Sequence, residues 1–223
     1  MKLEKILQEY ASFSSVLPLR LQSAALHVFD LSSEESPFQQ IDFQDLQSVI
    51  ILTKKILEKH HAILGIGRYA ESRNIYRHSK LFSEDQRDFH LGLDLTVPIG
   101  TAISTPLAAS IHSFQDNQGM GDYGPTIILQ HQLQQQVFYT LYGHLSRASL
   151  KNLEPGKLLA AGEAFAYIGD ARENGAWAPH LHFQIIEDLD GCWGDYPGVC
   201  AIQDKQRYLE NCPDPNLILR LPI

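Results

Sequence analysis

Two short segments of the chain alternate apolar residues with residues that can bind a metal ion. In FHLGLDL, residues 89–95, the apolar side chains occupy every second position, so on an extended strand His90, Gly92 and Asp94 point to the opposite face. Gly92 leaves space between the two polar side chains that a larger residue would fill. One face of this segment therefore suits a core, and the other suits a shared ion.

The second segment, PHLHFQI at residues 179–185, repeats this pattern. Its apolar residues share one face, and His180, His182 and Gln184 share the other. The two imidazoles emerge about 6–7 Å apart along such a strand. Both cannot easily bind one ion with good geometry, so we expect one to be a ligand and the other a catalytic partner. The spacing alone does not say which is which.

These residue types favour zinc over other metals. Neutral imidazoles and a carboxylate are its usual nitrogen and oxygen ligands, and a catalytic zinc site keeps three protein ligands with one position open for water. Zinc lowers the pKa of that water from about 15.7 towards roughly 7. His144, at the end of the alternating run VFYTLYGHL, could act as a base or as a donor to a developing oxyanion. The pattern predicts one zinc ion per chain.

Taken together, the segments FHLGLD, YGHLS and PHLHF resemble the lysostaphin-type (LytM-like) zinc metallopeptidases. The motifs of that family are His-x-x-x-Asp, a lone His in a Tyr-Gly-His-Leu context, and His-x-His. The order of the motifs and the Gly-containing hairpin LEPGKLLAAGEAFAYIG are also similar, over about residues 85–187. The resemblance implies that His90, Asp94 and His182 bind zinc. It implies that His144 and His180 polarise the water and stabilise the tetrahedral intermediate.

The chain departs from the family in the loop that leads to His-x-His. The family uses a Gly-Thr-Gly-like, Ser-containing loop, whereas residues 169–179 read GDARENGAWAP. This loop lines the substrate groove in the family, so Arg172 and Trp177 are candidates for substrate contact, with simple packing within the loop as the alternative. We expect five further histidines to lie at the surface or behind the site: His60, His61, His78, His112 and His131.

The elements that must position these residues follow from hydrophobic periodicity. Apolar residues at three-and-four spacing predict amphipathic helices over 3–11 and 44–60, the second capped by Asp42 or Asp45. From about residue 61, short alternating runs separated by Gly, Pro, Asn and Asp predict strands. We therefore expect an α+β fold dominated by an antiparallel sheet. The expected divisions are an N-terminal helical extension (1–84), a LytM-like zinc peptidase domain (85–190) and a C-terminal tail packed on that domain (191–223).

The composition of the chain argues against some classes of binding partner. The formal charge of −8 with scattered carboxylates argues against nucleic acid, and no apolar run approaches the roughly 18 residues of a membrane span. The N-terminus has no secretory signal pattern, which favours the cytoplasm, and the family resemblance leaves a secreted or periplasmic location as the alternative. Cys192, Cys200 and Cys212 fit no disulfide framework and no zinc knuckle, so we expect free thiols or at most one bridge. The oligomeric state is not indicated.

The leading functional hypothesis is a zinc metalloendopeptidase that hydrolyses a peptide or amide bond, with peptidoglycan-like cross-links as the expected substrate. One alternative is a cytosolic amidase or peptidase acting on a small peptide. Another is a non-catalytic regulator that uses the fold to bind a partner, since a fold by itself does not fix a function. Loss of zinc ligands would favour the regulator, but all five motif residues are present.

Overall fold

The computed structural model describes residues 2–18, 26–41, 45–73 and 86–223. Asp42, His78 and the predicted boundary between residues 84 and 85 lie outside these residues. The strands have the bounds β1 Leu26–Val28, β2 Leu64–Gly67, β3 Arg87–His90, β4 Leu93–Thr96, β5 Ala102–Ser104, β6 Ala109–Asn117, β7 Gly124–Leu133, β8 Gln136–Gly143, β9 Leu158–Leu159, β10 Ala164–Tyr167, β11 His180–Ile186 and β12 Val199–Ala201. The α-helices are α1 Leu3–Glu9, α2 Leu46–Lys59, α4 Lys205–Asn211 and α5 Asn216–Leu219, and short 3-10 helices span Pro37–Gln40, Arg147–Leu150 and Ile202–Asp204.

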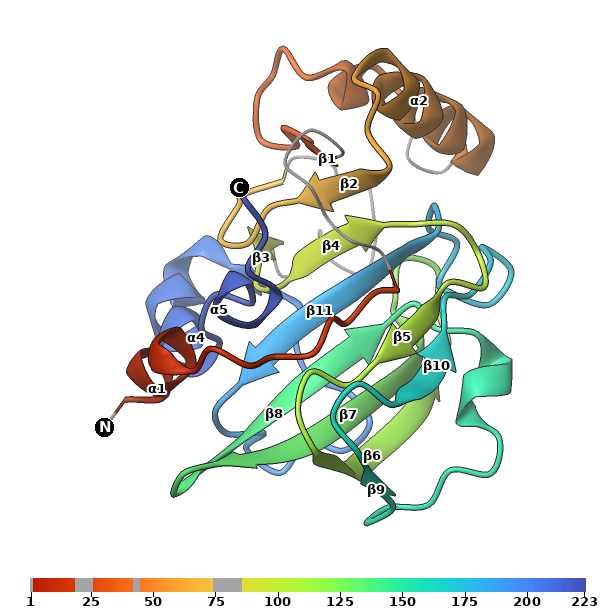
Figure 1. Ribbon diagram of the computed structural model, residues 1–223. Coiled ribbons are helices and arrows are strands. Elements are labelled where there is room, and N and C mark those ends of the chain that lie inside the picture. Colours follow the sequence, from red (N-terminus) through yellow and green to blue (C-terminus); the bar gives the residue numbers. More distant parts are fainter. Residues whose placement is uncertain (1, 19–25, 42–44, 74–85) are drawn as a thin grey trace.

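An eight-stranded sheet organises the molecule, in the order β1-β2-β4-β11-β8-β7-β6-β9 (Figure 1). Its strand pairs are antiparallel except β1 with β2, and two small sheets, β5 with β10 and β3 with β12, flank it. The expectation of an α+β fold with a predominantly antiparallel sheet is confirmed. None of the helices in the described part of the chain is long and apolar enough to cross a membrane.

Both faces of the central strands are covered. On β11, Leu181, Phe183 and Ile185 enter the main core, as the alternation predicts, and the small β5–β10 sheet and the two chain ends contribute to the same core. Ile186 belongs to a second cluster that includes residues of the C-terminal region. A sheet covered in this way keeps solvent away from polar side chains on its second face as well.

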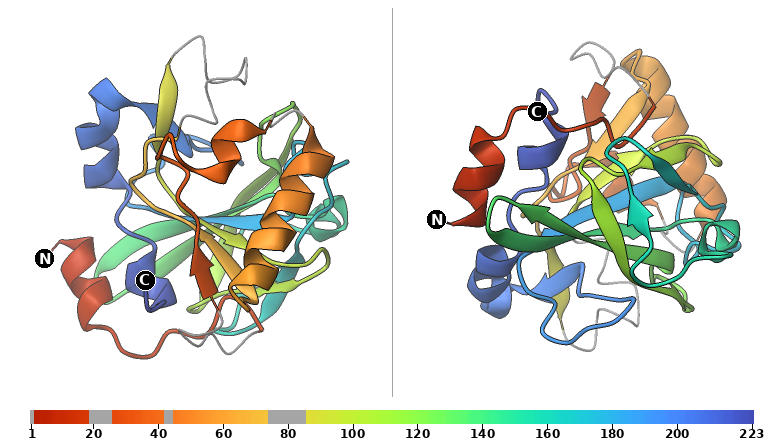
Figure 2. Two further views of the ribbon diagram at one scale, coloured as in Figure 1. Left: turned by 90° about the horizontal axis from the view of Figure 1, so that it is seen from above. Right: turned by 60° about the horizontal axis from the view of Figure 1, so that its bottom comes forward.

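The two ends of the chain pack against each other. Helices α1 and α5 lie side by side (Figures 1 and 2), and the guanidinium of Arg220 donates to the backbone oxygens of Leu7, Gln8 and Tyr10 at 2.7–3.2 Å. These carbonyls would otherwise lack partners at the end of α1. Arg220 thus anchors the C-terminal end of the chain to the end of α1, while the predicted packing of residues 191–223 on the domain 85–190 stays a prediction.

The N-terminal region is more than a set of helices. Helices α1 and α2 lie where the periodicity predicts them, and the Asp45 carboxylate accepts from the Ser48 N–H as the cap of α2. However, β1 and β2 also extend the main sheet beyond β4. Strands β1 and β2 thus share a sheet with strands that carry the predicted site, and the predicted division at residue 84 stays a prediction.

A buried histidine in this sheet provides a test of packing. His131 on β7 is 1% exposed, its Nδ1–H donates to the Ala108 carbonyl at 3.3 Å, and its Nε2 lies 2.7 Å from the Thr140 hydroxyl. Burial lowers the pKa of His131 from 6.5 to about 4. The unfolded chain therefore binds more protons than the folded chain between these pH values, and stability falls as the pH falls through this window.

We expect His131→Gln to remove this part of the pH dependence. Between pH 6.5 and 4 the free energy of unfolding of the wild type should fall by about 3 kcal/mol more than that of the variant, as measured by urea denaturation. His61→Gln, at an exposed position, is the control and should follow the wild type. Parallel curves for wild type and His131→Gln would contradict the assignment of a neutral buried imidazole.

Candidate metal centre

Four neighbouring strands bring the central residues of the site into one row across the sheet. Gly67 on β2 is the register partner of Asp94 on β4, Asp94 is that of His182 on β11, and His182 is that of Gly143 on β8. Adjacent strands lie about 4.8 Å apart, so register alone places the Asp94 and His182 side chains within reach of each other. Residues that are far apart in the sequence meet here because the strands are paired.

His90 reaches the same point from a different strand. The alternation predicts one strand over residues 89–95, but β3 ends at His90, β4 begins at Leu93, and the chain bends between them. The bend is held by hydrogen bonds from the His90 N–H to the Glu71 carbonyl and from the Leu91 N–H to the Gly198 carbonyl, both 2.9 Å. It brings the rings of His90 and His182 to 5.0 Å, nearly perpendicular.

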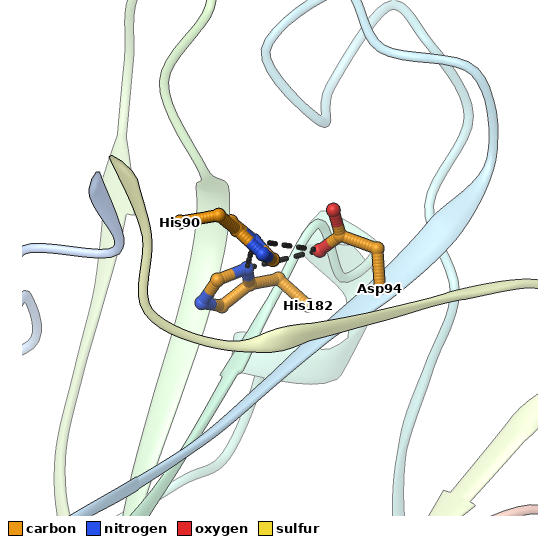
Figure 3. Close-up of side chains that lie close together, drawn as sticks. All are labelled: His90, Asp94 and His182. Carbon is orange, nitrogen blue, oxygen red and sulfur yellow. Dashed lines mark hydrogen bonds and ion pairs between the residues drawn. The ribbon is translucent and has the colours of Figure 1, made fainter. Parts of the chain in front are cut away.

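Three atoms of these side chains converge (Figure 3). Asp94 Oδ1 lies 3.3 Å from His90 Nε2 and 3.0 Å from His182 Nδ1, and the two nitrogens are 3.1 Å apart. A zinc ion bound by two nitrogens and one oxygen at about 2.0–2.2 Å requires such a triangle of donors. Among the described residues, this is the group of three metal-binding side chains that the structure brings together.

Each of the three side chains has a second partner that fixes its orientation. His90 Nδ1–H donates to the Arg68 carbonyl at 2.8 Å, and His182 Nε2–H donates to Gln184 Oε1 at 2.9 Å. Asp94 Oδ2 accepts from Arg73 Nη1 at 2.5 Å. Protons on the outer nitrogens leave the inner nitrogens with lone pairs directed at the triangle, which is the usual arrangement around bound zinc.

The site is buried, and its charges are balanced. The Asp94 side chain is 14% exposed, and those of His90 and His182 are 1% and 4% exposed. Burial opposes ionisation of Asp94, but the nearby His90 imidazole and Arg73 guanidinium outweigh it and hold the pKa of Asp94 well below its usual range. Burial and the Arg73 charge lower the pKa of His90 to about 4. At neutral pH the site therefore presents a carboxylate and a neutral His90 imidazole.

His144 and His180 lie beside the triangle with their rings 4.1 Å apart. His144 Nδ1–H donates to the Asn174 carbonyl at 2.9 Å, and His180 Nδ1–H donates to the Ala178 carbonyl at 2.7 Å. Both Nε2 atoms therefore carry lone pairs, and His180 Nε2 lies 3.8 Å from Asp94 Oδ1. Burial is the main cause that lowers the pKa of each, for His144 well below its usual range. Two neutral imidazoles thus accompany the three converging donors.

His144 has a backbone conformation that is uncommon for its residue type. His144 directly follows the end of β8 and has a φ of +61°. Its N–H donates to the Tyr123 carbonyl at 2.9 Å, and its carbonyl accepts from the Gly169 N–H at 3.0 Å. A residue with a side chain at positive φ needs such support from its surroundings. In this conformation the imidazole bonds to the Asn174 carbonyl.

The loop before β11 is organised by Asn174, which is fully buried. Its side chain bonds both the N–H and the carbonyl of Trp177, at 3.0 and 3.1 Å, while its own carbonyl holds His144. Trp177 lines the pocket above the site. The Arg172 side chain is 90% exposed, pairs with Asp170 and does not line this pocket. Of the two candidates for substrate contact, only Trp177 is placed for it.

The remaining histidines described lie outside the donor triangle. His27 stacks on His60, His61 follows α2, and His112 bonds to Ser113. His131 is buried on β7 and hydrogen-bonds to Thr140 of the neighbouring strand β8. Cys192, Cys200 and Cys212 are free thiols. The sequence does not single out Arg73, and only its position two residues after an acidic Glu71 hints at an ion pair. Tyr123, whose hydroxyl lies 3.4 Å from His182 Nε2, carries no signal in the sequence either.

Gly92 tests the space that the site needs. A Cβ at this position would lie 2.5 Å from His182 Cε1, 2.6 Å from its Nε2 and 2.9 Å from the Phe183 carbonyl oxygen. Gly92→Ala should displace the His182 ring and raise the Kd for zinc by about 10- to 100-fold, measured by competition with a chromogenic chelator. Gly119→Ala, where the nearest contact is an ordinary 3.5 Å, is the matched control. An unchanged Kd for Gly92→Ala would contradict the placement of His182.

Arg73 tests the balance of charge. It is 1% exposed and donates to Glu71 at 3.0 Å as well as to Asp94, whereas Arg68 also pairs with Glu71, at 3.6 Å. Arg73→Met should lower the free energy of unfolding of the metal-free protein by about 3–5 kcal/mol, because it removes the guanidinium that compensates the buried Asp94 carboxylate. Arg147→Met, which removes the solvent-exposed pair with Asp116, should change it far less. Equal effects of the two substitutions in urea denaturation would refute the role of Arg73.

Comparisons with known proteins agree with these motifs. A sequence model of peptidase family M23 matches residues 88–191. No curated protein matches the chain. Similar solved structures include a zinc-containing peptidase from Vibrio cholerae (24% identity, TM-score 0.36, covering 44% of this chain and 27% of that chain) and a putative peptidase M23 from Pseudomonas aeruginosa (22%, 0.40, 58% and 43%). The catalytic domain of lysostaphin from Staphylococcus simulans is a third (22%, 0.38, 54% and 80%).

The chain spans less than half the length of the first two of these proteins. The family match begins just before His90, ends after β11, and so includes all five residues that the motifs single out. Residues 88–191 therefore match peptidase family M23, and this match supports the resemblance to the LytM-like peptidases.

Proposed function

We propose that the protein is a zinc-dependent peptidase that hydrolyses a peptide or amide bond. In this proposal His90, Asp94 and His182 are the ligands of one zinc ion per chain, and His144 and His180 are the catalytic pair. The observation that carries it is the convergence of His90 Nε2, Asp94 Oδ1 and His182 Nδ1, each held from behind by a second hydrogen bond. Side chains that met by accident would not share this arrangement.

The donor set fits zinc rather than a harder cation. Two imidazole nitrogens and one carboxylate oxygen suit zinc, whereas calcium and magnesium prefer oxygen ligands throughout. Three protein ligands leave one position for water or substrate, as in other hydrolytic sites. A zinc ion bound there would act as a Lewis acid that polarises the scissile carbonyl and lowers the pKa of a water molecule.

In this proposal, His144 and His180 transfer protons during hydrolysis. His144 and His180 each hold their Nδ1–H against a backbone carbonyl, so each imidazole keeps Nε2 available to accept a proton. After it accepts a proton, the same Nε2–H can donate to a developing oxyanion or to the leaving amine. The fixed Nδ1 bonds prevent the rings from turning away between these steps. The low pKa values keep both side chains in the proton-accepting form at neutral pH.

Peptide cross-links of the peptidoglycan type and short peptides are both substrates that this chemistry could cleave. The two classes are separated by assay on purified peptidoglycan beside short synthetic peptides. The cytoplasmic location inferred from the N-terminus stays a prediction.

We expect His182→Ala to lose zinc and His180→Ala to retain it. Zinc per chain, measured by atomic emission after dialysis, should be close to one in the wild type and in His180→Ala and close to zero in His182→Ala. Hydrolysis should fall by about 100- to 10,000-fold in His180→Ala and be lost on chelation and restored by added zinc in the wild type. His112→Ala, outside the pocket, is the control for both measurements.

Two results would overturn the proposal. Retention of zinc by His182→Ala with its loss from His180→Ala would reverse the assigned roles. A zinc-loaded wild type that cleaves neither peptides nor peptidoglycan would instead favour the non-catalytic regulator.

A further inference from the structure

The candidate metal centre lines a pocket that is also lined by residues outside the region that matches family M23. The pocket has a volume of about 250 Å³ and is lined by all five site residues. It is also lined by Phe29, Leu31, Phe38, Val49 and Thr53, which precede the matched residues 88–191. The N-terminal region therefore contributes directly to the space above the metal centre.

This contribution is mainly apolar. Phe29, Leu31, Phe38 and Val199 form one buried cluster, and Trp177 packs against it. The rings of Phe29 and Phe38 meet edge to face at 5.4 Å. The Trp177 ring also lies near the two catalytic candidates. Its centroid is 6.3 Å from that of His144 and 6.4 Å from that of His180. An apolar wall thus continues up to the residues that would act on the scissile bond.

The wall is fixed to the site rather than laid loosely over it. The Phe29 N–H donates to the Ile66 carbonyl at 2.8 Å, and the Leu31 N–H donates to Glu71 at 3.1 Å. Glu71 in turn accepts from Arg73, which bonds to Asp94. A Cβ at position 65 would lie only 2.4 Å from Cε2 of the Phe29 ring, so this close packing requires Gly65. These hydrogen bonds connect the apolar residues to Asp94 and so fix their position beside the candidate site.

The size and cover of the pocket limit what can enter. The side chains of the five site residues are largely buried, and the volume is below the roughly 300–1,000 Å³ of pockets that hold drug-sized ligands. A short segment of peptide fits such a space more readily than a cross-linked polymer strand. Arg87, Asp122 and Asp195 also line the pocket, so the apolar character is confined to one part of it.

We propose that Phe29, Phe38 and Trp177 form a specificity subsite for a bulky apolar side chain next to the scissile bond, and that the substrate is a short peptide. This inference rests on the proposed peptidase function. A Leu or Phe side chain that enters the subsite exchanges water for apolar contacts, whereas Gly offers nothing to bury. The discrimination expected from such a pocket is about 10- to 100-fold in kcat/KM.

The test uses the full-length zinc-loaded protein and a set of short Ala-based peptides. Each position is changed in turn to Gly, Leu or Phe, and kcat/KM is measured for every peptide. At one position next to the scissile bond, we expect Leu or Phe to exceed Gly by about 10-fold or more. Phe38→Ala should lower this ratio to about 3-fold or less, with Phe38→Leu between it and the wild type. A ratio within one preparation does not depend on how much of the variant is folded.

Phe13→Ala is the matched control. Phe13 is a partly buried residue of the same N-terminal region, packs against Tyr10 and does not line the pocket, so its loss should leave the ratio unchanged. Equal cleavage of Gly, Leu and Phe peptides by the wild type would overturn the inference. So would equal ratios in Phe38→Ala and Phe13→Ala, or faster cleavage of intact peptidoglycan than of any short peptide.

A binding measurement separates this inference from the proposed function. Calorimetry of Phe and Gly versions of the same peptide with the catalytically impaired His180→Ala should give a Kd about 10-fold lower for the Phe peptide. If this difference is found but the wild type cleaves nothing, the subsite stands and the peptidase proposal fails. If peptides are cleaved but the two Kd values are equal, the subsite fails and the peptidase proposal stands.

Discussion

The buried carboxylate of Asp94 is the group on which the rest of the site depends. One oxygen faces the imidazoles of His90 and His182, and the other is held by Arg73. An uncompensated carboxylate in such a position would be too costly to remain ionised. His90 and Arg73 therefore keep Asp94 ionised, and Arg73 holds the oxygen that faces away from the imidazoles. Arg73 thus supports the candidate site although it lies outside the family match.

The same ion pair ties the N-terminal region to the chemistry. Arg73 is itself buried and is balanced by Glu71, whose other oxygen accepts from the Leu31 N–H. The segments 26–41 and 45–73 are thus connected to the candidate site through charge as well as through the sheet pairing of β1, β2 and β4. Phe29, Leu31 and Phe38 of these segments line the pocket that contains the candidate site. This connection is why the apolar wall occupies a defined position above the metal centre.

Rigid and irregular parts of the chain have different tasks. The pairing of β4 with β11 places Asp94 opposite His182. A shift of one strand along the other would break the hydrogen bonds between the two strands. His144 lies in a strained turn, and His180 lies at the first residue of its strand, where the Asn174 loop and the Ala178 carbonyl set the ring positions. Asp94 and His182 thus sit on paired strands of the main sheet, and His90 sits at the end of β3 beside the bend. His144 and His180 are positioned by loop residues.

The sequence by itself determined the candidate residues and the class of fold, because alternation of apolar and polar residues reports directly which side chains share a face of a strand. It was enough to place His180, His182 and Gln184 opposite the core on β11. It could not reveal that the chain bends between His90 and Leu93, since local alternation continues through the bend. Only the tertiary structure decided that Arg73 neutralises Asp94 and that Phe29 and Phe38 wall the pocket. Those contacts join segments about 20 to 150 residues apart, and their energies depend on burial and register that no local pattern encodes.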